Sequence, residues 1–265
     1  EPELPPFPTA GIRLSAIELF IDTQCGGRAK LEGKTTAEVS GEIIVPLTKA
    51  RQLSGCELLG ETAAATVFVS HAWKYTFLDV VDTLRARPEL QGADVSLWFD
   101  IFSVNQHKTQ VLPFKWWTTT FQDAIKEIGT TALVLLPWEN PVPLTRAWSL
   151  WEIYSTVETG SKLVVALPEA EEQSLHEALA TRLEAVDAML GRVDLAKAEA
   201  WKEEDRRRIF DIVEKADGGF GRVNEVVFSG LRAWLVEQAK GRVAALEGQA
   251  ERGDVAGGAD LEAVR

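Results

Sequence analysis

Residues 66–70 read TVFVS, and this short apolar run is the first of four that decide the fold. The other three read VSLWF at 95–99, ALVLL at 132–136 and LVVAL at 163–167. Each run is short enough for a strand that is buried on both faces. Longer segments with apolar residues at helical spacing lie between the runs, at 76–85, 116–128 and 145–157. This alternation predicts repeated βα units on a doubly wound parallel sheet.

Outside these units the sequence predicts an extension on each side. Four prolines in EPELPPFPTA (1–10) favour an extended arm, and residues 11–60 indicate a short strand at 17–21 and some helix at 48–59. After Pro168 the pattern predicts helices at 171–190, 203–216 and 222–240 and a fifth, edge strand at 192–198. We therefore expect three parts: a partly extended N-terminal extension (1–60), an α/β domain with C-terminal helices (61–240), and a flexible tail or linker (241–265).

The composition excludes several classes of partner. The 265 residues carry 28 Lys and Arg against 40 Asp and Glu, and a net charge of 28 − 40 = −12 argues against sequence-independent binding to nucleic acid or to an anionic membrane. No apolar run approaches the roughly 18 residues of a membrane span. Cys25 and Cys56 allow one disulfide at most, so we expect a reducing, cytoplasmic location. The numbering begins at Glu1 rather than Met, so a targeting segment could have been removed.

In a doubly wound sheet, ligands bind outside the carboxyl ends of the strands. The segments that leave these ends begin at Ser70, Asp100, Pro137 and Pro168. Seven of the nine tryptophans fall between residues 66 and 168, and Trp73 and Trp138 follow strand ends directly. The candidate site is therefore expected in this Trp-rich part of the chain.

Three other kinds of chemistry lack the residues they need. No G-x-S-x-G elbow is present, and adjacent Ser70 and His71 would point to opposite sides of an extended backbone. His and Cys never occur at the spacing of a structural zinc site. The stretch 27–35 resembles a phosphate-binding P-loop but has five residues between its glycines where that loop has four.

The strongest local signal is the segment TRAWSLWEIY at 145–154. Trp148 and Glu152 are four residues apart, so on a helix they share a face. A carboxylate beside an indole sits in a partly apolar wall, which raises its pKa, and the pair suits a flat cationic ring stacked on Trp148. The alternative is ordinary helix packing, with Glu152 solvated or paired with Arg146.

Four motifs in this order resemble a known family. They are F-V-S-H-A-W at 68–73, W-F-D-I-F-S-V-N-Q-H at 98–107, P-W at 137–138 and R-A-W-S-L-W-E-I at 146–153. Together they resemble Toll/interleukin-1 receptor (TIR)-like domains of the divergent algal and protist type, and the second motif is also similar to the heterokaryon-incompatibility domain. The similarity covers residues 62–168 and extends more loosely to 238. It implies a flavodoxin-like sheet with strand order 2-1-3-4-5.

The resemblance also implies a function. Many TIR domains cleave the nicotinamide–ribose bond of NAD⁺, whereas others only self-associate and recruit partners. Glu152 matches the family's catalytic glutamate, Trp148 matches the aromatic residue one turn earlier, and 101–115 matches the assembly loop. The sequence departs from the family at Ser149, near the glutamate, and at His71-Ala72-Trp73.

Two hypotheses follow. In the first, the chain binds a nicotinamide dinucleotide and hydrolyses it without metal or cofactor, with Glu152 stabilising the ribosyl cation. The substrate would be bound by Trp148, Ser70, Trp73, Asp100, Trp138 and Ser149. In the second, the chain is a non-catalytic module that binds a second copy or another protein through 101–115 and a Trp-rich surface.

Overall fold

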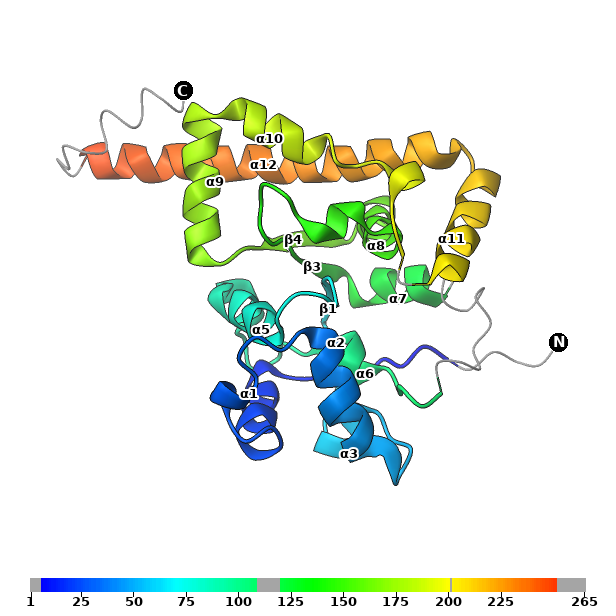
Figure 1. The fold of residues 1–265 in the computed structure, drawn as a ribbon. Helices are drawn as coiled ribbons and strands as arrows, with labels where there is room; N and C mark the ends of the chain where they lie inside the picture. Colours follow the sequence, from blue (N-terminus) through cyan, green and yellow to red (C-terminus); the bar gives the residue numbers. More distant parts are fainter. Residues whose placement is uncertain (1–5, 109–119, 201, 252–265) are drawn as a thin grey trace.

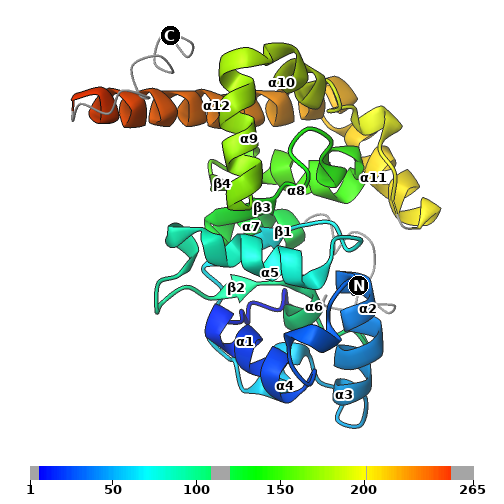
Figure 2. The ribbon, with the colours of Figure 1, turned by 60° about the vertical axis from the view of Figure 1, so that its left-hand side comes forward.

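The computed structural model describes residues 6–108, 120–200 and 202–251. At its centre lies a sheet of four parallel strands in the order β2-β1-β3-β4 (Figure 1; β2 is labelled in Figure 2). The register sets Phe68 of β1 beside Trp98 of β2 and Thr131 of β3. The predicted α/β class with a parallel sheet is confirmed, and the strand order is compatible with a flavodoxin-like fold. The strands are β1 (Val67–Ser70), β2 (Leu97–Trp98), β3 (Thr130–Val134) and β4 (Lys162–Ala166).

The predicted fifth strand at 192–198 is wrong. Residues Leu195–Lys197 form a short 3-10 helix, η7. The Asp194 side chain accepts from the Ala196 N–H (3.2 Å), and the Leu195 N–H donates to Asn224 Oδ1 (2.9 Å). These side chains take the hydrogen bonds that a neighbouring strand would need, so the apolar residues of the segment reflect packing against helices rather than sheet pairing.

Two helices between the strands begin and end close to the predicted positions, α5 (Phe77–Ala86) and α8 (Ala147–Glu158), and α7 (Phe121–Ile128) ends where predicted. The short helix α6 (Asp100–Ser103) was not predicted. Thr76 caps α5 by accepting from the Asp79 N–H at 3.3 Å, and Gly129 ends α7 with φ at 76°, a conformation that favours glycine. The first part of the helix predicted at 116–128, up to residue 119, lies outside the described residues.

The N-terminal extension is mostly helical. Its helices are α1 (Leu14–Thr23), η1 (Arg28–Lys30), α2 (Thr36–Val39), the π-helix η2 (Ser40–Ile44), α3 (Val45–Lys49) and α4 (Gly55–Leu59). The strand predicted at 17–21 is therefore wrong. Ile17, Phe20 and Ile21 recur at the i, i+3, i+4 spacing of a helix face, and all three are buried.

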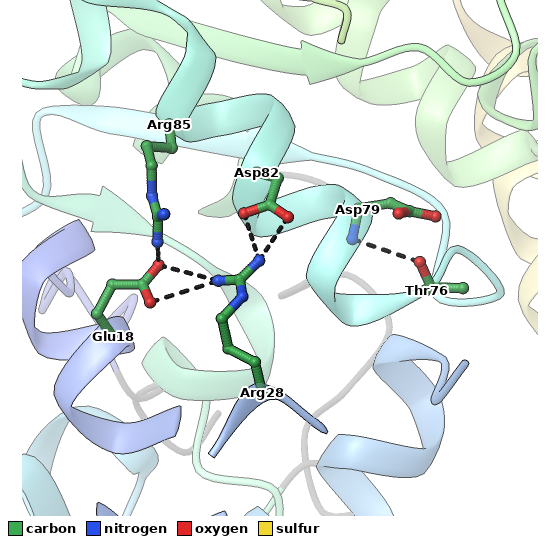
Figure 3. Close-up of polar contacts among 6 residues, drawn as sticks. All are labelled: Glu18, Arg28, Thr76, Asp79, Asp82 and Arg85. Carbon is green, nitrogen blue, oxygen red and sulfur yellow. Dashed lines mark hydrogen bonds and ion pairs between the residues drawn. The ribbon is translucent and has the colours of Figure 1, made fainter. Parts of the chain in front are cut away.

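This extension shares a core with the sheet. Ile12 pairs with Leu97 of β2 through two backbone hydrogen bonds of 2.8 Å. Figure 3 shows that ion pairs also join α1, η1 and α5, because the Arg28 guanidinium lies between Glu18 (3.4 Å) and Asp82 (2.5 Å) and Arg85 also contacts Glu18. The extension is thus held to the α5 side of the sheet by packing, backbone pairing and charge.

The C-terminal helices lie on the other side of the sheet (Figure 2). They are α9 (Glu169–Thr181), α10 (Leu183–Leu190), α11 (Glu203–Lys215) and α12 (Gly219–Glu251). The predicted helix 171–190 is broken at Arg182, and the helix predicted at 222–240 continues to Glu251, inside the predicted tail. A Cβ at Gly230 of α12 would lie 2.6 Å from Val157 Cγ2, so this glycine lets α12 pack closely on α8. No helix in the described part of the chain is long and apolar enough to cross a membrane.

Alternate residues of β3 face the two layers. Ala132 and Val134 lie in a hydrophobic cluster with α1 and α5, whereas Leu133 lies in a second cluster with α8 to α12. The carboxyl ends of the strands lie between these two layers. The residues that follow β1 and β2 meet there with the first turns of α8.

Candidate functional site

The carboxyl end of β1 brings Ser70 against Glu152. Ser70 is the last residue of β1, and its Oγ donates to Glu152 Oε2 at 2.5 Å. Glu152 reaches this point from the second turn of α8 and is half-buried. Two residues that the sequence predicted for the site, 82 positions apart, are therefore in direct contact.

A second pair lies beside the first. Trp73, in the loop after β1, donates its indole N–H to Asp100 Oδ2 at 2.5 Å. Asp100 opens α6 directly after β2, and its Oδ1 accepts from the Ile101 N–H at 2.8 Å. Both pairs thus combine a carboxyl group with neutral hydrogen-bond donors at adjacent strand ends.

Both carboxyl groups have raised pKa values. The pKa of Glu152 is raised to about 8, chiefly by burial; the hydrogen bond from Ser70 acts against this shift and the nearby Asp100 adds to it. Burial also raises the pKa of Asp100. Within the described residues, neither carboxyl group has a Lys, Arg or His nitrogen at ion-pair distance. The alternative in which Glu152 pairs with Arg146 is therefore not formed.

His71 also lies close to Asp100, and the sequence analysis did not assign it to the site. Its ring packs edge-on against Phe99 with centroids 4.9 Å apart, and burial lowers its pKa, so it is neutral at pH 7. Its buried Nε2 has no hydrogen-bond partner among the described residues. Ser70 contacts Glu152 while His71 packs on Phe99, so the adjacent serine and histidine form no catalytic pair.

Trp148 lies one turn before Glu152 on α8, as the spacing predicted. It is half-buried, and its ring lies 5.8 Å from that of Phe121 at an angle of 48°. Ser149, the next residue, is buried. The first turn of α8 therefore carries one indole that packs against Phe121, one turn before Glu152, and turns Ser149 into the interior.

Trp138 does not join the site. It is 1% exposed, and its indole N–H donates to Ser174 Oγ on α9 at 3.1 Å. Its backbone N–H donates to Glu171 Oε2 at 2.8 Å. A ring covered in this way offers no face to a ligand, so the stacking role predicted for Trp138 is not supported.

The predicted assembly segment 101–115 is partly core. Ile101 and Phe102 of α6 are fully buried. Further along, Asn105 Nδ2 donates to the Gln52 carbonyl at 2.7 Å, and the His107 ring is 2.9 Å from Thr48 Oγ1. The motif V-N-Q-H therefore ties this segment to the N-terminal helices, and residues 109–115 lie outside the described residues.

The sequence also contains a stretch that resembles a P-loop and His, Cys and acidic side chains, the residue types that bind metals. The P-loop-like stretch 27–35 follows α1 rather than a strand, and its Thr35 forms a capping box with Glu38. The described residues hold no group of three His, Cys, Asp or Glu side chains that could bind a metal. Cys25 and Cys56 are both free thiols.

A hollow of about 350 Å³ lies elsewhere, between the C-terminal end of α8 and α12. It is lined by Val157, Glu158, Arg222, Glu225, Val226 and Ser229. Arg222 already pairs with Glu158 (3.1 Å) and lies 3.8 Å from Glu225. Its charge is satisfied within the protein, so the hollow lacks the uncompensated groups found at the strand ends.

Comparisons with protein-family models, curated proteins and solved structures find no match to this chain. The fold and the strand-end geometry define a doubly wound α/β protein with a pair of carboxyl groups at the edge where such sheets bind ligands. The function is therefore argued from these residues.

Proposed function

We propose that this chain is a TIR-like protein that binds a nicotinamide dinucleotide at the carboxyl edge of its sheet and hydrolyses the nicotinamide–ribose bond. One observation carries the proposal. Glu152, held by Ser70, is a half-buried carboxyl group with no cationic partner among the described residues, and its pKa is raised to about 8. Such a group favours a ligand that brings its own positive charge.

The chemistry suits this carboxyl group. The C–N bond breaks with its electron pair moving to the ring nitrogen, so the cationic ring leaves as neutral nicotinamide. The ribose becomes an oxocarbenium-like cation, which the ionised Glu152 stabilises. Water then adds to the anomeric carbon and loses a proton. Because the leaving group needs no proton, one carboxylate is sufficient and the reaction calls for no metal or cofactor.

The raised pKa gives the reaction a pH dependence. Glu152 is mostly protonated at pH 7, whereas stabilisation of the ribosyl cation requires its ionised form. A bound cationic ring lowers the pKa again, because an opposite charge favours the carboxylate. We therefore expect kcat/KM for NAD⁺ to rise with pH through about 8.

The neighbouring residues take defined roles in this proposal. Ser70 orients the Glu152 carboxyl group, and Trp148 supplies an indole one turn away. Trp73 and Asp100 line the adjoining strand end. Ser149 and Trp138 act through packing only, because both are buried.

The test is nicotinamide release from NAD⁺ at high protein concentration. Glu152→Gln keeps the shape and the contact with Ser70 but cannot ionise, so we expect release to fall by about 10²- to 10³-fold. Glu127→Gln is the matched control, because Glu127 is an exposed residue of α7, and it should release nicotinamide at the wild-type rate. Equal release by wild type and Glu152→Gln, or no release by wild type in any assembly state, would contradict the proposal.

A second proposal is a non-catalytic module that binds a second copy or another protein. It is favoured by Trp73, which is 38% exposed and is the most exposed tryptophan of the described residues. The remaining Trp-rich surface that this proposal needs is reduced, because Trp98, Trp138 and Trp151 are buried. Concentration-dependent self-association that is lost in Trp73→Ala, without nicotinamide release at any concentration, would select this second proposal.

A further inference from the structure

Trp73 is held in an unusual position for an exposed aromatic residue. Its indole N–H is fixed on Asp100 Oδ2 at 2.5 Å, yet 38% of the residue remains exposed. The hydrogen bond fixes the nitrogen edge of the indole. An exposed tryptophan and a carboxyl group are therefore held together at the strand ends, where Ser70 and Glu152 also meet.

The charge of this corner is not balanced from within the described residues. Asp100 receives hydrogen bonds only from neutral donors, the Trp73 indole and the Ile101 N–H. The basic side chain that interacts electrostatically with Asp100 is His71, and burial keeps the His71 ring neutral. Glu152 is the other carboxyl group that acts here, and its ionised form has the same sign as that of Asp100. Among the described residues, this corner therefore holds two carboxyl groups and no cationic side chain at ion-pair distance.

This arrangement matches one kind of ligand. The face of an indole attracts cations through its quadrupole, and a carboxylate beside it adds direct charge pairing. A hard metal ion would need several oxygen ligands, and the described residues hold no such group. A flat organic cation can cover the indole and meet the carboxylate at the same time.

We propose that Trp73 and Asp100 form a subsite for a pyridinium cation, which selects the oxidised, positively charged nicotinamide ring over the neutral reduced ring. The selection of one redox state rests on the proposed function, whereas the cation subsite itself does not. Occupation of the subsite favours the ionised form of the neighbouring Glu152 carboxyl group, so binding releases a proton to solvent.

Two small probes test the subsite without the rest of a dinucleotide. 1-Methylnicotinamide carries a fixed pyridinium charge, whereas nicotinamide has the same ring and amide but is neutral at pH 7.5. Calorimetric or NMR titration of the wild-type protein should show roughly fivefold to twentyfold tighter binding of the cation. Equal affinity for the two probes would overturn the proposal, and this comparison needs no variant.

Variants then assign the preference to named residues. Asp100→Asn keeps the size of the side chain but removes its charge, and Trp73→Leu removes the indole. Each should reduce the preference for the cation to within about twofold. Asp187→Asn changes the same charge at an exposed residue of α10 and should leave the preference unchanged. A folded Asp100→Asn protein, by circular dichroism, with the wild-type preference would also overturn the proposal.

The outcomes separate this inference from the proposed hydrolysis. Release of nicotinamide from NAD⁺ without any preference for 1-methylnicotinamide would remove the subsite and keep the hydrolase. Preference for the cation without turnover would keep the subsite and contradict the hydrolase.

Discussion

Two carboxyl groups in this molecule have opposite surroundings. Glu61, where the N-terminal helices join the sheet, is 7% exposed and meets the Arg13 guanidinium at 2.7 and 3.0 Å. These contacts lower the pKa of Glu61. Glu152, at the carboxyl edge, is half-buried beside Ser70 and Asp100, and its pKa is raised to about 8.

The comparison extends to the surroundings of each residue. In the N-terminal half, Glu18 and Asp82 also meet arginines, Arg28 and Arg85 among them. At the carboxyl edge, the hydrogen-bond donors to Glu152 and Asp100 in the described part of the chain are all neutral. Carboxylates that pair with arginines hold elements of the fold together. Two neighbouring carboxyl groups without a cationic partner lower the stability of the folded state at high pH, and they are retained where a ligand supplies positive charge.

The largest effect on stability should come from Glu152→Gln. The folded state of the wild type keeps a proton on Glu152 up to about pH 8, whereas the unfolded chain loses it near 4.5. Wild-type stability therefore falls as the pH rises through this window, and the glutamine variant lacks that fall. At pH 9 the variant should be more stable by roughly 2–4 kcal/mol, a range that allows for solvent at a half-buried group. At pH 5 the two proteins should be nearly equal.

Urea unfolding at a series of pH values measures this difference. Glu127→Gln is the control and should follow the wild type at every pH. Parallel stability curves for Glu152→Gln and wild type between pH 5 and 9 would show that Glu152 ionises normally in the folded protein, and the contrast with Glu61 would be lost.

A smaller effect of opposite sign is expected at Glu61. Glu61→Gln removes a charge-assisted contact with Arg13 and should lower the free energy of unfolding by about 1–2 kcal/mol at pH 7. Because Arg13 lowers the pKa of Glu61, this stabilisation is present above the ordinary pKa and disappears as the pH falls through the lowered one. Unfolding at pH 7 and at a series of pH values below 4.5 checks both statements, and an unchanged stability at pH 7 would contradict the structural role.

The central part of the fold could be predicted because its signals are local. The apolar runs that contain Val67–Ser70 and Lys162–Ala166 have the length of buried strands, and α8 has helical spacing. Of the N-terminal helices, the sequence predicted only the helix at 48–59, a range that contains α4, and it missed α1 and α2. Two local signals for helix starts were present. Thr35 with Glu38 and Ser54 with Glu57 are capping boxes that mark the starts of α2 and α4.

The site could be predicted in part for the same reason. The rule for strand ends and the spacing of Trp148 and Glu152 led to Glu152, Ser70 and Asp100. The burial of Trp138 could not be predicted from the sequence, because its hydrogen bonds are made with Ser174 and Glu171 of a helix more than 30 residues away. The bond between Trp73 and Asp100 likewise depends on the tertiary neighbours of two strand ends.

The most direct test of this account is the titration of the Glu152 carboxyl group itself. Isotope-edited infrared or NMR spectroscopy of glutamate-labelled protein, with Glu152→Gln to assign the signal, gives its pKa. We predict a value of about 8 in the free protein and a lower value with 1-methylnicotinamide bound. A pKa near the ordinary 4.5 in the free protein would show that this carboxyl group is solvated and charged at pH 7, which would contradict the account.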